Sequence, residues 1–201
     1  MRLAACLAVA LLASGCASLQ QRPVHSEATE LRWAQRSEAL AAIHGFSLQG
    51  RFTQVGGSGG NLRWQQRADG QFELQLSGPF GAGAISMTGT TDGVEVRSKE
   101  GTQFAPDPQQ WMLQHLGWTL PLNNLRSWAL GRPAPGAVEH YELDESGQLT
   151  RLQQGGWTVR FDRYKAVVSL ALPGRIEAEQ QDVQLRLVID RWDALDLAAK
   201  S

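Results

Sequence analysis

The side chains that could perform catalytic or metal chemistry are few in this chain and widely spaced. No two of its four histidines have metal-ligand spacing, and its two cysteines are Cys6 and Cys16. No nucleophile elbow is predicted, and the glycine-rich run at residues 56–60 precedes a predicted strand rather than the helix start that a phosphate site needs. The sequence therefore predicts no catalytic constellation, no metal site and no cofactor. The Cys16 thiol is the one reactive group that the sequence singles out, because of the segment that precedes it.

Cys16 closes a segment with the features of a secretory signal. A positive start at Met1-Arg2 is followed by a short apolar run and then by small residues. The run is too short to cross the ~30 Å hydrocarbon core of a bilayer as a helix. Residues 12–16, Leu-Ala-Ser-Gly-Cys, resemble a bacterial lipoprotein signal, although Ala13 stands where that motif prefers leucine. The alternative is an ordinary signal that happens to contain a cysteine.

The lipoprotein resemblance implies a processed and anchored chain. It implies that residues 1–15 are removed, that the Cys16 thiol receives a diacylglycerol, and that the new amine is acylated as well. The residue after the cysteine is Ala17 rather than an aspartate, which by the same resemblance implies the periplasmic face of the outer membrane. One acyl chain anchors a protein only marginally, whereas three make attachment effectively permanent.

Composition sets the frame for the rest of the chain. Removal of residues 1–15 from the 201 leaves 186, enough for one domain with a hydrophobic core. It takes away one of the 19 basic residues and none of the 20 acidic ones, so the net charge of −2 gives no argument for nucleic-acid binding. No disulfide is expected. We therefore expect a lipidated tether over residues 16–27 and a single domain over 28–201.

Two hydrophobic periods divide the expected domain. A helical pattern with Leu31, Trp33, Ser37, Leu40 and Ala41 on one stripe covers residues 27–43, and two short helices are predicted between residues 106 and 131. The first of these two starts at Asp107-Pro108 and ends near Leu116-Gly117. Elsewhere the period is two, with glycine- and aspartate-containing turns, which indicates an antiparallel sheet. The predicted strands are 46–52, 62–66, 72–76, 85–87, 94–96, 138–143, 148–153, 157–161, 167–170, 175–179 and 183–189.

A sheet with one apolar face must curl or be covered, and the predicted helices are the natural cover. The expected fold is mainly β with helices: an incomplete antiparallel β-barrel of about ten to eleven strands under a helical lid, enclosing an apolar cavity. The inward-facing candidates for lining this cavity are Phe52, Leu62, Trp64, Leu74, Leu76, Ile85, Met87, Trp118, Leu122, Leu125 and Trp128. For each of them, ordinary core packing is the competing interpretation.

The run GWTLPLNNLRSWALG at residues 117–131 resembles the pattern G-x-x-(L/I)-P-x-x-x-L-x-x-W-x-x-G of the LolB family of outer-membrane lipoproteins. Shorter matches follow in the family's order over nearly the whole mature chain: Gly50-Arg51, Trp64-Gln65, residues 78–81, 154–157, 172–176 and 189–192. The chain departs from the family at Ile43-His44, where an aromatic residue is common, and at Phe80, where an aliphatic residue is usual.

The resemblance implies an incomplete barrel with a helical lid and a transfer activity without chemistry. A periplasmic carrier, LolA, passes an acylated lipoprotein to the LolB receptor, which releases it into the outer-membrane lipids. Three acyl chains with roughly 45 CH₂ groups at ~0.8 kcal/mol each would cost about 36 kcal/mol to expose to water, so a shielded route is required. The protein would be a monomer without enzymatic activity.

The resemblance also assigns a role to the turn that contains Pro79 and Phe80. It corresponds to the family's protruding hydrophobic loop, which touches the membrane during release, and Pro79 would stiffen it. The alternative is that Phe80 folds back onto the core. Two other functions stay open for the whole protein: a scaffolding lipoprotein with a packed interior, and a module that stores or senses a hydrophobic ligand.

Overall fold

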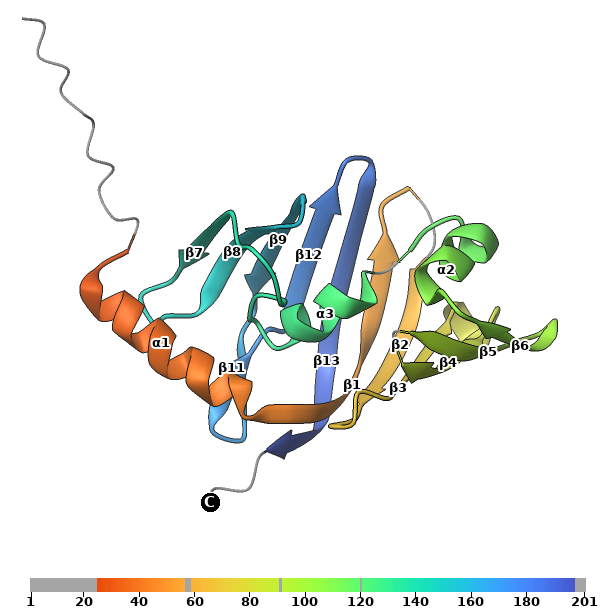
Figure 1. Ribbon diagram of the computed structural model, residues 1–201, viewed down its shortest axis with the longest axis horizontal. Helices are drawn as coiled ribbons and strands as arrows, with labels where there is room; N and C mark the ends of the chain where they lie inside the picture. The colour runs from red at the N-terminus through yellow and green to blue at the C-terminus, as the bar shows by residue number, and fades with distance from the viewer. Residues whose placement is uncertain (1–24, 57–58, 91, 120, 198–201) are drawn as a thin grey trace, which may run out of the picture.

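The computed structural model describes residues 25–56, 59–90, 92–119 and 121–197. Within these ranges three α-helices lie on the same side of a large curved sheet (Figure 1): α1 (Glu27–Ala41), α2 (Pro108–Leu116) and α3 (Leu122–Ala129). A short 3₁₀ helix, η1 (Pro79–Gly81), connects two strands. Cys16 and the predicted signal lie outside the described residues, so their roles stay predictions.

The main sheet has eleven antiparallel strands in the order β6-β5-β4-β3-β2-β1-β13-β12-β9-β8-β7. The edge strands β6 and β7 do not pair with each other among the described residues, so the sheet is open and the predicted incomplete barrel is confirmed. Its strands are β1 (Ile43–Gln54), β2 (Gly59–Gln66), β3 (Phe72–Ser77), β4 (Ile85–Thr90), β5 (Gly93–Ser98), β6 (Gly101–Ala105), β7 (His140–Leu143), β8 (Leu149–Gln154), β9 (Trp157–Asp162), β12 (Arg175–Gln180) and β13 (Val183–Leu197).

The period of two places one side of the sheet in the core. On β2 and β3 the residues Leu62, Trp64, Phe72 and Leu74 are buried under the helices, while their sequence neighbours face solvent. Bulges in the pairing of β1 with β13 occur beside Gly50, where an added Cβ would lie 2.2 Å from the carbonyl oxygen of Val188. A glycine is required at that close approach.

The helix boundaries of α2 follow from the residues predicted to cap it. The Asp107 carboxylate accepts hydrogen bonds from the backbone N–H groups of Gln109 and Gln110 at 2.9 and 3.0 Å. Pro108 occupies the first turn, and Gly117 ends the helix with φ of +75°. The sequence-based prediction of this helix is confirmed.

The prediction for α1 was only partly right. The helix ends at Ala41, and Ile43 and His44 begin β1 instead of extending the helix. Leu31, placed on the apolar stripe by its spacing, is 61 % exposed, whereas Leu40 is fully buried. Ile43 is β-branched and precedes the apolar alternation that starts at Phe46, and both features favour a strand over a helix here.

One strand prediction was wrong, and one strand was not predicted. The single strand predicted over 167–170 is a separate two-stranded hairpin of β10 (Lys165–Val167) and β11 (Leu170–Leu172), which turns at Val168 with φ of +55°. Edge strand β6 was missed because four of its five residues are exposed, which leaves no apolar alternation in the sequence. In the part of the chain that the structure describes, no helix is long and apolar enough to span a bilayer.

Candidate functional site

All eleven residues predicted to line the cavity belong to one apolar cluster between sheet and helices. Ten of them are buried, and Ile85 is partly buried against the others. The lid, which comprises α2, residues 117–119 and α3, contributes Trp118, whose ring centroid lies 5.4 Å from that of Phe52 on β1. The structure thus brings the predicted residues together, and their contact with an acyl chain stays a prediction.

The space inside this cluster is small. An apolar cavity of about 20 Å³ lies between α3 and the sheet, which is little more than the space one water molecule needs. Phe52, Leu62 and Leu125 were predicted to line it. Sequence reasoning missed five further apolar lining residues: Pro121, Ile176, Ala178, Leu185 and Leu187. The alternation on β12 and β13 was a usable signal for all of them except Pro121. No acyl chain fits into this volume.

A second hollow opens on another side of α3. It has a volume of about 650 Å³, and Trp64, Phe72, Leu122 and Pro135 form the apolar part of its wall. The rest of the wall is largely polar and includes Gln66 and Arg126. The edge of the lid therefore separates the buried apolar cluster from an open hollow whose wall contains both apolar and polar residues.

A buried glutamine fixes the C-terminal end of the lid. Gln154 on β8 is 3 % exposed; its side-chain oxygen accepts hydrogen bonds from the Ala134 backbone N–H at 2.9 Å and from the Trp128 indole N–H at 3.4 Å. Its side-chain nitrogen donates to the Ala134 carbonyl at 2.7 Å. Trp128 also packs edge-on against Trp157 with ring centroids 5.9 Å apart. Sequence reasoning missed Gln154, because a polar residue at an inward position gives no apolar signal.

Gly131 lies at the same end of the lid, just after α3. Its φ is +71°, and an added Cβ would lie 3.0 Å both from the Tyr164 hydroxyl and from the Pro173 ring. The Tyr164 hydroxyl donates to the Leu149 carbonyl at 2.7 Å, and burial raises the pKa of this phenol above its usual value. A glycine therefore satisfies both the backbone conformation and the limited space.

The segment between β3 and β4 forms a compact turn. Gly78 N–H donates to the Ala82 carbonyl at 2.7 Å, Ala82 N–H donates to the Pro79 carbonyl at 3.2 Å, and Pro79 is exposed. The Phe80 side chain lies outside the described part of the structure. Its predicted contact with the membrane therefore stays a prediction.

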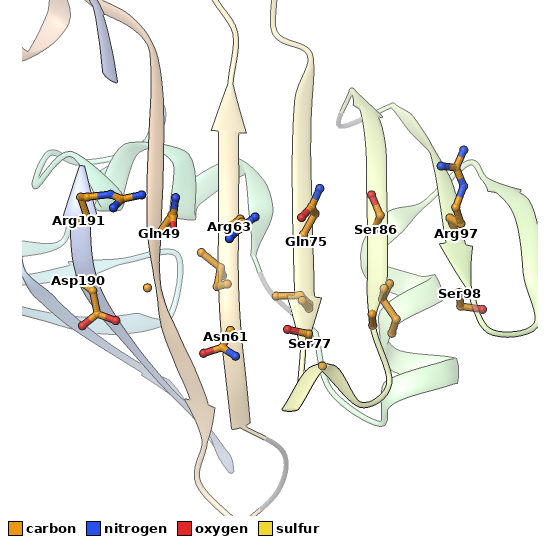
Figure 2. A pocket seen from close by; sticks show the side chains of 16 residues that line it. Gln49, Asn61, Arg63, Gln75, Ser77, Ser86, Arg97, Ser98, Asp190 and Arg191 are labelled. Atoms are coloured by element: carbon orange, nitrogen blue, oxygen red, sulfur yellow. The ribbon is translucent and has the colours of Figure 1, made fainter. Parts of the chain in front are cut away.

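The sheet face opposite the helices carries another hollow, of about 790 Å³. Figure 2 shows polar side chains on neighbouring strands along its wall, with the helices behind the sheet. The apolar residues Leu62, Leu76 and Ile85 also line it. Sequence reasoning predicted no site on this face. Among the described residues no group of three or more histidines, cysteines or acidic residues could hold a metal ion.

Comparison with known proteins identifies the family. The model of the family "Outer membrane lipoprotein LolB" matches residues 44–192. The chain belongs to the LolB family. "Outer-membrane lipoprotein LolB" of Nitrosococcus oceani is 39% identical over 196 residues, which is 95% of this chain and 96% of that protein. The protein of the same name in Stutzerimonas stutzeri is 36% identical over 201 residues, with 97% of this chain and 96% of that protein covered.

A solved structure supports the fold independently of sequence. A LolA superfamily protein from Nitrosomonas europaea superposes with a TM-score of 0.53 at 9% identity, covering 84% of this chain and 94% of that one. The LolB match spans β1, the turn at η1, the lid and most of β13. LolB is a lipoprotein-transport family and not a known enzyme family, and the resemblance drawn from the sequence is confirmed.

Proposed function

We propose that this protein is the outer-membrane receptor that accepts acylated lipoproteins from a periplasmic LolA-type carrier and inserts them into the membrane. It works as a monomer without catalysis, attached to the periplasmic face through lipids on Cys16. The observation that carries the proposal is the covered apolar face: a helical lid closes over a continuous apolar cluster.

The transfer requires the lid to move. A cavity of about 20 Å³ is far below the ~300–1,000 Å³ of ordinary ligand pockets, so acyl chains enter only when lid side chains leave the sheet. The C-terminal end of α3 is held by Trp128 and Gln154, whereas Pro121 and Leu125 nearer its start border the cavity. The start of α3 and the preceding α2 are therefore the part that lifts.

Transfer without nucleotide hydrolysis must run downhill in free energy from carrier to receptor to bilayer. The open lid exposes Phe52, Leu62 and Trp64, which offer apolar surface to the chains. The same surface is covered again when the lid closes, so closure drives the chains out toward the bilayer. The receptor thus protects its cargo without retaining it.

The test locks the lid. A form beginning at Ala17 contains no cysteine, so Leu125→Cys with Ile176→Cys introduces the only two thiols, on opposite walls of the cavity. A short reducible cross-linker should abolish uptake of a lipoprotein from a loaded carrier, measured by pull-down, and reductant should restore it. The matched control joins Ala166→Cys to Ala171→Cys, which already lie opposite each other on the paired strands β10 and β11, and should transfer normally.

A scaffolding lipoprotein is the second candidate, and one observation favours it. The interior is filled by the protein's own side chains, as expected of a domain that holds no ligand. A carrier that delivers cargo to another receptor serves as the reference. If neither the lid pair without cross-linker nor the control pair accepts cargo from it, the transfer function is contradicted and the scaffolding function is supported. Uptake by the cross-linked lid pair would contradict the lid movement alone.

A further inference from the structure

A row of polar side chains crosses the helix-free face of the sheet. The strand register aligns one residue from each of six adjacent strands: Arg191 on β13, Gln49 on β1, Arg63 on β2, Gln75 on β3, Ser86 on β4 and Arg97 on β5. Figure 2 shows these six side chains side by side along the 790 Å³ hollow. With neighbouring strands ~4.8 Å apart, Arg63 lies about 10 Å from Arg191 and about 14 Å from Arg97 along the row.

The row contains three guanidinium groups and no carboxylate. Arg97 pairs with Glu95 at 3.2 Å and Arg191 pairs with Asp193, both outside the row and exposed. Such exposed pairs are weak and exchange readily for another anion. The Arg63 guanidinium, near the middle of the row, has no hydrogen bond or ion pair with any described residue.

The acidic groups near the row are already engaged. Asp190 lines the hollow, but it accepts hydrogen bonds from Arg51 at 3.0 and 2.8 Å, which lower the pKa of this carboxyl. Glu73 accepts a hydrogen bond from Gln75 at 2.6 Å. The side-chain amide of Asn61 also faces the hollow and can donate hydrogen bonds, whereas that of Gln49 already donates to Asp193 at 3.0 Å. The hollow therefore presents Arg63, a cation with no partner among the described residues, together with the Asn61 amide, in a protein whose predicted mature charge is slightly negative.

The hollow is continuous with the turn predicted to meet the membrane. Its wall includes Gly81 of η1 and Ser77 and Ala84 on either side of η1. When this turn touches a bilayer, the hollow reaches the headgroup layer. Guanidinium groups bind phosphate with two parallel hydrogen bonds, and basic residues near a membrane surface each contribute about 1 kcal/mol of attraction to anionic lipids.

We propose that the outer-face hollow centred on Arg63 binds the phosphate of phospholipid headgroups while the β3–β4 turn contacts the membrane. This inference rests on the proposed function and adds a lipid-recognition site on the face opposite the cargo. The site orients the receptor, so that the turn and the edge of the lid face the bilayer together during release.

The test measures equilibrium binding to vesicles. The chain from Ala17 to Ser201 retains every described element and has no lipid of its own. Arg63→Gln should reduce partitioning to vesicles of phosphatidylethanolamine and phosphatidylglycerol about fivefold at moderate salt. The control Arg67→Gln removes the same charge from an exposed site beyond the other end of β2 and should change binding less than twofold. Vesicles of a neutral glycolipid without phosphate should bind neither variant nor the parent chain.

Three results would overturn the proposal: equal binding by Arg63→Gln and the parent, equal losses at Arg63 and Arg67, or equal binding to phosphate-free vesicles. Uptake of cargo from the carrier, measured separately by pull-down, keeps this failure distinct from failure of the proposed function. The Arg63→Gln variant should take up cargo normally and release it to vesicles slowly. If the parent chain binds vesicles through Arg63 but takes no cargo, the lipid site stands and the receptor function falls.

Discussion

The indole N–H of Trp128 donates a hydrogen bond to the buried side-chain oxygen of Gln154, 3.4 Å away, and so joins the lid to strand β8. The same oxygen receives the Ala134 N–H, and the Gln154 amide nitrogen donates to the Ala134 carbonyl. One buried side chain therefore satisfies three polar groups that have no access to water. The lid is anchored by polar contacts at this end and by apolar contacts at the other.

We expect Gln154→Leu to lower the free energy of unfolding by about 3 kcal/mol, because it leaves a buried indole N–H and a buried peptide unpaired. Urea denaturation followed by tryptophan fluorescence measures this loss. The control Gln153→Leu changes the neighbouring, partly exposed residue on the other side of the same strand and should stay within about 0.5 kcal/mol of the parent. Equal effects at both positions would mean that the buried contacts of Gln154 contribute nothing.

Gly131→Ala should destabilise the protein by about 3 kcal/mol, since the new Cβ meets both Tyr164 and Pro173 in a left-handed backbone. Gly117→Ala is the matched control, because its φ of +75° is nearly the same and nothing lies within 4 Å of the added Cβ. The control should lose only about 1 kcal/mol. Thermal unfolding of both variants separates the steric effect from the conformational one.

The Arg51–Asp190 pair predicts a pH dependence of definite sign. Hydrogen bonds from Arg51 lower the pKa of Asp190 below its usual 3.8, so the pair stabilises the fold above that pH and is lost as the pH falls through the lowered pKa. The Tm difference between the parent and Asp190→Asn should therefore be present at neutral pH and shrink in strong acid. A difference that grows on acidification would contradict the assignment.

Phe80→Glu should leave uptake of cargo from the carrier unchanged and slow its release into vesicles several-fold, because a carboxylate at the tip of the turn resists entry into the bilayer. Release is followed by flotation of the passenger with the vesicles. Leu31→Glu makes the same type of change on the exposed surface of α1 and should release cargo normally. Normal release by Phe80→Glu would remove the turn from the delivery step.

His25 holds the start of α1 against β7. Its Nε2 accepts the Leu143 backbone N–H at 2.8 Å, its Nδ1 lies 2.9 Å from the Glu30 carboxylate, and its ring stacks on Tyr141 at 5.5 Å. His25→Ala should speed hydrogen exchange of the Leu143 amide at least tenfold while leaving the amide of Val159 in the core unchanged. Unaltered exchange at Leu143 would show that the hydrogen bond gives no local protection.

Much of the fold could be predicted from the sequence because alternation is a strong signal where one face of a strand is buried. Leu62, Trp64, Leu74 and Met87 were placed on the inner face from period two alone, and the structure has them in the core. The two caps of α2 could also be predicted from the sequence. The Asp107 side chain accepts hydrogen bonds from the first backbone N–H groups, and Gly117 adopts the left-handed conformation that ends the helix.

The remainder depends on contacts that no local pattern encodes. Gln154 is buried because three distant polar groups converge on it, and the row through Arg63 exists only once six strands are in register. Strand β6 is exposed along most of its length and is defined by pairing with β5. The size of the cavity likewise follows from how the lid packs on the sheet.

Because the interior is filled, the side chains of the lid compete with the acyl chains of the cargo for the same apolar surface. Since lid side chains occupy the space that acyl chains need, the apparent affinity for cargo equals the intrinsic affinity multiplied by the small fraction of molecules that are open. Cargo entry then exchanges one set of apolar contacts for another, so calorimetry should find a heat-capacity change much smaller than burial of free acyl chains would give. In such a protein, a change that favours the open lid strengthens capture of cargo and weakens its delivery. The free-energy difference between the open and closed lid therefore sets how capture and delivery are balanced.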